Sequence, residues 1–169
     1  NNGGGFYRTE LYLHEAKMNG GVIEAPCVNL SNYLTVIREN VIHLGLGYIK
    51  GLETSTIKRM VEEQPYTDLR DFVDRVQISL EQALLVIRAG AFRFTGKDKK
   101  QLLWDAHFLL GHNKKTKTTA NLFDVRVKEF ALPELWYHKL ETAFDQMELL
   151  GFPLSDPFQL LKEEPPSNL

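Results

Sequence analysis

The stretch "GYIKGLETSTIKRMV", residues 47–61, contains the sharpest change of pattern in the chain. Gly51 lies near its centre, with the apolar residues Ile49 and Leu52 close on either side. From residue 54 onward the apolar positions recur at helical spacing, which predicts a helix over residues 54–64. The stretch therefore predicts a tight corner that opens directly into a helix.

Such a corner has the sequence pattern of a helix-hairpin-helix element, in which two short helices are joined by a hairpin that contains glycine. A turn that opens a helix leaves backbone N–H groups unpaired, and these suit an anion such as a phosphate oxygen. We expect the amides around Lys50 to Glu53 to play this part. Lys50 adds a mobile positive charge, and Gly51 permits a close approach of the backbone.

A second corner follows in "LLVIRAGAFRFTGKDKKQLLW", residues 84–104. One helix is expected to end at Gly90 and the next to start near Lys97. Amides around Gly90 to Phe92 would be available here, as at the first corner. Five basic residues cluster at this junction: Arg88, Arg93, Lys97, Lys99 and Lys100.

The charge of the chain is segregated along its length. The total net charge is −2 and the isoelectric point is near 6.2, so the overall charge does not by itself indicate nucleic acid as a partner. Between Arg88 and Lys117, however, eight basic residues face two acidic ones, a local net charge of +6 against −8 for the remainder. Two corners in tandem beside this basic segment favour the tracking of a nucleic-acid backbone.

The rest of the chain reads as mainly helical with one small β-hairpin. A helix over residues 6–18 precedes extended chain and loop over residues 22–33, and the hairpin follows with "YLTVI" and "VIHLGL" on either side of a turn at "REN". Further helices are predicted over residues 67–76, 79–90, 97–111 and 133–151. Their expected N-terminal residues are Thr67 and Ser79 as caps and Pro133 in a first turn. The helix over residues 54–64 is expected to be capped by Thr54 or Ser55.

Composition narrows the class of protein further. At 169 residues and 43% hydrophobic, the chain can bury a core. Its single cysteine, Cys27, excludes an internal disulfide and fits a reducing compartment. No apolar run approaches the ~18 residues of a membrane span. We expect a soluble, cytoplasmic protein, and the ends "NNGGGFY" and "KEEPPSNL" suggest a piece excised from a longer polypeptide.

Four stretches, in this order and spacing, resemble the alpha subunit of bacterial DNA polymerase III. They are "FYRTELYLHEAKMNGGVIEAPCVNLS", "IHLGLGYIKGLETSTIKRMVEE", "LEQALLVIRAGAF" and "ELLGFPLSDPF". The resemblance implies that residues 1–35 end the fingers region and that residues 36–110 hold the hairpin and a tandem helix-hairpin-helix domain. Residues 111–125 would be a linker, and residues 126–169 a helix leading to an oligonucleotide-binding-fold domain that the chain itself lacks.

The resemblance also implies partners and chemistry. The parent would be a DNA-directed DNA polymerase, a nucleotidyltransferase with Mg²⁺ in a palm upstream of this piece, and its partners would be duplex DNA, the sliding clamp and other replisome subunits. A hairpin of this kind can hold a monovalent cation. The expected DNA-binding residues are Lys50, Gly51, Leu52, Glu53, Lys58, Arg59, Arg88, Gly90, Ala91, Arg93, Lys97, Lys99 and Lys100.

The linker contains a candidate clamp-binding peptide, "TANLF". By the resemblance, Thr119 stands in place of the usual glutamine, and Ala120, Asn121, Leu122 and Phe123 follow. Two large apolar residues in a polar segment need a hydrophobic partner, which is either the clamp or the core of this chain.

No catalytic or metal site is predicted. Polymerase chemistry needs clustered carboxylates for two metal ions, whereas Asp68, Asp71 and Asp74 fit the solvated face of a helix. The five histidines are scattered, without the spacing of metal ligands. The aromatic residues of the later helices are expected in the core: Trp104, Phe108, Trp136, Tyr137 and Phe144.

Two other functions remain open on these grounds. The chain could be mainly a clamp-docking interaction module, which the peptide at residues 119–123 would carry. It could also be a helix-hairpin-helix module of a DNA repair nuclease or ligase.

Overall fold

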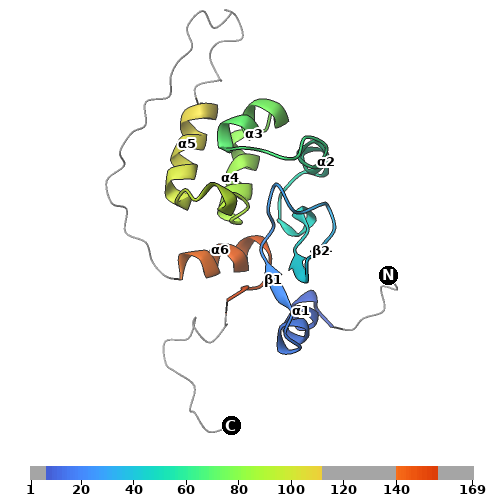
Figure 1. Ribbon diagram of the computed structural model, residues 1–169. Helices are drawn as coiled ribbons and strands as arrows, with labels where there is room; N and C mark the ends of the chain where they lie inside the picture. Colours follow the sequence, from blue (N-terminus) through green and yellow to red (C-terminus); the bar gives the residue numbers. More distant parts are fainter. Residues whose placement is uncertain (1–6, 112–139, 156–169) are drawn as a thin grey trace, which may run out of the picture.

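The computed structural model describes residues 7–111 and 140–155, and these residues form a mainly helical fold with one small sheet, as predicted (Figure 1). Helices α3, α4 and α5 lie together, α6 lies below them, and α1 lies at the opposite end beside β1 (Figure 1). The elements are α1 (Thr9–Met18), β1 (Val22–Glu24), β2 (Val36–Arg38), β3 (Val41–His43), the 3₁₀ turn η1 (Leu46–Tyr48), α2 (Thr54–Glu62), α3 (Leu69–Val76), α4 (Leu80–Arg88), the 3₁₀ turn η2 (Arg93–Thr95), α5 (Lys99–Gly111) and α6 (Glu141–Leu149).

The sheet contains the predicted hairpin and one strand that was not predicted. β2 and β3 pair antiparallel, and Glu39 and Asn40 form the turn with φ of 48° and 66°. Positive φ at both central residues matches the right-handed twist of the strands. β1 pairs parallel with β3, so the strand order is β1-β3-β2. Three residues are too few to show a strand period, so only extended chain was predicted there.

The helix boundaries correct two of the predicted caps. Thr54 lies inside α2, and the preceding Glu53 occupies the cap position without accepting a side-chain hydrogen bond. The cap of α3 is Asp68 rather than Thr67, because the Asp68 side chain accepts from the Asp71 amide. Ser79 caps α4 as predicted.

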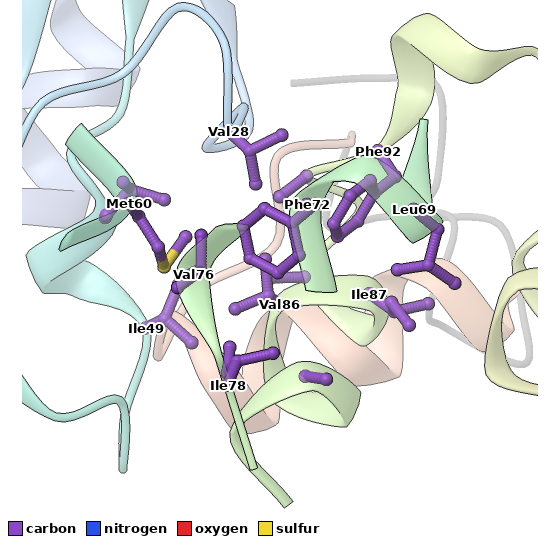
Figure 2. Packing of buried hydrophobic residues seen from close by; sticks show 14 of the residues in the cluster. Val28, Ile49, Met60, Leu69, Phe72, Val76, Ile78, Val86, Ile87 and Phe92 are labelled. Atoms are coloured by element: carbon purple, nitrogen blue, oxygen red, sulfur yellow. The ribbon is translucent and has the colours of Figure 1, made fainter. Parts of the chain in front are cut away.

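The core is built around the buried face of α3, with Phe72 at its centre (Figure 2). Leu69, Phe72, Val73 and Val76 follow helical spacing and are all buried. The Phe72 ring makes edge-to-face contacts with Tyr66 and Phe92, at centroid distances of 4.9 and 5.0 Å. The core also takes in residues from the first corner, α2, α4 and the end of α6: Ile49, Ile57, Met60, Val86, Ile87, Leu149, Leu150 and Phe152.

Two of the aromatic residues expected in the core lie at the surface instead. Trp104 on α5 is 51% exposed and Phe144 on α6 is 57% exposed. Other residues of these two helices are buried in their place, among them Leu102 and Ala106 on α5 and Ala143 on α6. Phe108 is half-buried. Trp136 and Tyr137 lie outside the described residues.

Candidate nucleic-acid interface

The first corner is a hairpin between η1 and α2, so its first helix is only a 3₁₀ turn. Gly51 lies at the exposed tip with φ of +81°, in the left-handed region that favours glycine. A Cβ there would also approach Leu85 Cδ1 of α4 to 3.4 Å. The backbone conformation therefore accounts for a glycine at this position, whereas the approach to Leu85 is an ordinary van der Waals distance.

The structure corrects the expectation that all the amides from Lys50 to Glu53 are available, because three of the four are paired; the Gly51 amide, at the exposed tip, has no partner among the described residues. The Lys50 amide donates to the Leu149 carbonyl at 2.8 Å, and the Leu52 amide donates to the Ile49 carbonyl at 3.2 Å. The Glu53 amide donates to Gln82 Oε1 at 2.8 Å. These three groups stabilise the hairpin and do not point at a ligand. The sequence could not reveal this, because Leu149 and Gln82 are distant along the chain.

Besides the Gly51 amide, unpaired amides lie a few residues later in the described chain, at the start of α2. The first amide to bond back along the helix is that of Ile57, which donates to the Glu53 carbonyl at 2.9 Å. The amides of Thr54, Ser55 and Thr56 precede it, and the Glu53 side chain does not cap them. Thr54 and Ser55 are exposed. The anion-attracting end of the helix is therefore open to solvent.

Two exposed lysines belong to this corner, Lys50 before the hairpin tip and Lys58 in α2; Lys50 Nζ lies 3.5 Å from where a Gly151 Cβ would be. Within the described part of the chain, neither Lys50 nor Lys58 has an ion pair or a side-chain hydrogen bond. Lys58 lies one turn after Thr54 on the same face, and its Cα–Cβ bond tilts toward the helix N-terminus. Arg59 differs, because its guanidinium donates to the Val76 carbonyl and to Thr56 Oγ1. Lys50 and Lys58 are therefore the available cations of the first corner.

The second corner uses its amides and its arginine within the protein. The Gly90 amide donates to the Ile87 carbonyl and the Ala91 amide to the Val86 carbonyl. Arg93 donates to the carbonyls of Ala25, Pro26 and Gly90 at 2.8 to 3.0 Å, and its guanidinium lies 3.1 Å from Glu24 Oε2. Arg93 thus fastens the segment after β1 to this corner.

The remaining cations of the second corner are paired with carboxylates. Asp145 of α6 is buried and lies 2.8 Å from Arg88 and 2.9 Å from Lys99. The hydrogen bond that Arg88 donates to Glu148, with further contributions from Asp145, raises the pKa of the Arg88 guanidinium above its usual value. Lys97 lies 3.2 Å from Asp105, and Lys100 lies 3.4 Å from Glu141. These four cations of the second corner are therefore paired with acidic side chains from α5 and α6.

A further tight corner, between α3 and α4, was not singled out in the sequence. Gln77 adopts φ of 52° there, a left-handed conformation that glycine would adopt more easily. Ser79 then caps α4 by accepting from the Gln82 amide at 3.3 Å. The serine cap was recognised in the sequence. The corner was not, because Gln77 stands where a glycine would have marked it.

The three aspartates singled out in the sequence make local hydrogen bonds and one long ion pair. Asp68 and Asp71 accept backbone hydrogen bonds at the start of α3, and Asp74 pairs loosely with Arg70 at 3.9 Å. Among residues 7–111 and 140–155 there is no group of three potential metal ligands and no helix long and apolar enough to cross a membrane. The candidate clamp-binding residues 119–123 lie outside the described part of the chain.

Comparison with known families gives a match in the same region. Residues 20–102 match the model of the helix-hairpin-helix motif. This range includes the sheet, all three corners and the start of α5. The fold prediction of helix-hairpin-helix elements is thereby confirmed.

Known relatives are similar over a longer range. The chain is 32% identical over 109 residues to an error-prone DNA polymerase of Mycobacterium bovis, 31% over 126 residues to one of Bdellovibrio bacteriovorus and 29% over 102 residues to one of Corynebacterium glutamicum. These alignments take in 60 to 65% of this chain and only 10 to 12% of each relative. The chain spans about a tenth of the length of these curated relatives. Their names do not single out the replicative alpha subunit.

Proposed function

We propose that this chain is a non-catalytic part of a DNA polymerase of the polymerase III alpha-like type, and that it binds duplex DNA through its phosphates without reading sequence. The motif match over residues 20–102 and the similarity to error-prone DNA polymerases support this proposal. In the parent protein, nucleotidyl transfer and the Mg²⁺ ions that it needs would belong to the palm. Other replisome subunits would be partners of that parent.

The observation that carries the proposal is the open start of α2, in a corner that also contains the exposed lysines Lys50 and Lys58. The amides of Thr54 and Ser55 offer donors to a phosphate oxygen, and the helix dipole favours negative charge at that end. Lys50 and Lys58 add positive charge and release counterions when DNA binds. All of these contacts are made to the phosphate backbone, so they are insensitive to base sequence.

The second corner would make a smaller contribution. Lys97 is about half exposed, with 49% of its side chain accessible, and a phosphate would have to compete with Asp105 for it. Arg88 and Lys99 are more deeply engaged with Asp145. We therefore assign the main phosphate contact to the first corner and a secondary one to Lys97 and Lys100.

Titration of a labelled DNA duplex at several salt concentrations tests the proposal. The double variant Lys50→Ala, Lys58→Ala should bind every duplex sequence more weakly, and the slope of log K against log salt should fall by about 1 for each lost phosphate contact. Arg70→Ala, which removes an exposed charge from α3, is the matched control and should bind as wild type. Equal binding by the double variant and the wild type would reject the proposal.

Clamp docking through residues 119–123 remains a second candidate, supported by the two large apolar residues in that polar segment. Retention of the chain on immobilised clamp should be lost in the Leu122→Ala, Phe123→Ala variant, whereas DNA binding should not change. In a full-length enzyme the two contacts would reinforce each other by raising the effective concentration. Undiminished retention of the variant would eliminate this peptide as the docking site.

A further inference from the structure

Gln82 of α4 makes two hydrogen bonds to the backbone of the first corner. Its Nε2 donates to the Gly51 carbonyl at 2.9 Å, and its Oε1 accepts from the Glu53 amide at 2.8 Å. These two backbone groups flank Leu52, so one side chain fixes both sides of the hairpin tip. The contact joins segments that are about 30 residues apart in sequence.

The side chain that makes this contact is itself held in place. Gln82 lies in the first turn of α4, where its backbone amide donates to Ser79 Oγ at 3.3 Å. Leu85, three residues later on the same face of α4, reaches to 3.4 Å from where a Gly51 Cβ would be. The hairpin tip therefore rests on a polar and an apolar contact, both supplied by α4.

Among side chains of this length, a glutamine is suited to the position for a chemical reason. Its primary amide offers a donor and an acceptor at the same end, matching one carbonyl and one N–H. A glutamate would accept from Glu53 but could not donate to Gly51, and its charge would repel a phosphate nearby. A lysine would donate to Gly51 and leave the Glu53 amide unpaired.

We propose that Gln82 is the positioning residue of the phosphate-binding corner. It fixes the Gly51 and Glu53 peptides, and Glu53 immediately precedes the amides of Thr54 and Ser55 that would meet the phosphate. Because the Glu53 amide is occupied by Gln82, the anion is directed to the amides that follow it. This inference rests on the proposed DNA-binding function and adds to it the dependence of the first corner on α4.

The test compares Gln82→Met with wild type in the duplex titration, using the 169-residue chain. Methionine keeps the length of the side chain and removes both hydrogen bonds. We expect affinity about threefold to tenfold weaker, together with a salt slope lower by about 1, since one phosphate is no longer held. A purely structural effect would lower thermal stability without changing that slope at temperatures where the variant is fully folded.

Gln101→Met is the matched control, because Gln101 of α5 also uses its side-chain amide, donating to Asp105 at 2.9 Å. It should leave affinity and slope unchanged. Wild-type affinity and slope in Gln82→Met, with weaker binding by Lys50→Ala, Lys58→Ala, would overturn the role of Gln82 and leave the proposed function standing. Unchanged binding by the lysine variant would instead reject the function itself.

If Gln82→Met does not fold, a measurement on the wild-type chain tests the proposal instead. The side-chain amide protons of Gln82 should exchange with solvent more slowly than those of exposed Gln77, whose side chain has no hydrogen bond to another described residue. Added duplex should shift the Gln82 signals and leave those of Gln77 in place. Equal exchange rates, or no shift of the Gln82 signals, would contradict the proposal.

Discussion

Tyr66 is a buried residue whose polar groups are all satisfied by specific partners. Its side chain is 3% exposed, and its hydroxyl donates to the Met60 carbonyl at 2.7 Å. Its backbone amide and carbonyl both bond to the Asn29 side chain, at 2.8 Å. Burial raises the pKa of the Tyr66 phenol to about 12. The chain can therefore bury this ring only with its hydroxyl neutral and bonded.

Alkaline pH should weaken the fold through Tyr66. The unfolded phenol loses its proton near its ordinary pKa of 10, whereas the folded one keeps it to about 12. The free energy of unfolding should therefore fall as pH rises from about 10 to about 12. Urea unfolding at several pH values measures this fall. Tyr66→Phe should cost about 1 kcal/mol at neutral pH and show a shallower alkaline fall, and the same fall in both proteins would contradict this assignment. Exposed Tyr33→Phe is the control.

At the scale of an element, the start of α3 shows which signals the sequence carries. The apolar spacing correctly predicted the helix and its buried face, because that face depends only on local periodicity. The cap was misassigned by one residue. Asp68 accepts from the Asp71 amide at 2.9 Å, and Asp71 in turn accepts from the Thr67 amide at 3.0 Å. The hydrogen bond from the Thr67 amide lowers the pKa of Asp71.

The corrected cap of α3 makes a direct prediction. Asp68→Ala should lower the free energy of unfolding by about 1 kcal/mol, because the Asp71 amide loses its acceptor. Thr67→Ala should change it by less than about 0.5 kcal/mol, as for an ordinary surface position. Urea denaturation of both variants measures the difference. A larger loss from Thr67→Ala than from Asp68→Ala would restore threonine as the cap.

At the scale of the whole molecule, the long-range ion pairs decide which face is free. Asp145 of α6 joins Arg88 of α4 and Lys99 of α5, and the Lys50 amide of the first corner bonds to the Leu149 carbonyl at the end of α6. The basic residues at residues 88–100 looked in sequence like the strongest nucleic-acid signal. Lys97 pairs with nearby Asp105, but Arg88, Lys99 and Lys100 pair with residues of α6, so no local pattern could show that these three are occupied.

The substitution Asp145→Asn should therefore lower the stability of the fold. It leaves Lys99 and Arg88, with side chains 16% and 31% exposed, without their shared carboxylate. We expect a loss of about 3 kcal/mol in the free energy of unfolding. Asp74→Asn is the control; it removes a carboxylate from an exposed pair with Arg70 and should cost less than about 0.5 kcal/mol. Similar losses in both variants would show that the α6 ion pairs add little to stability.

The sequence by itself determined the helices, the β2–β3 hairpin and the corner at Gly51, because periodicity, caps and glycine act over a few neighbouring residues. The tertiary structure alone decided which groups of that corner are available. Gln82 and Leu149 occupy amides of the hairpin, and α6 pairs with the cations of the second corner. A hydrogen bond or ion pair depends on which distant segments meet, and only the packing of the core brings those segments together.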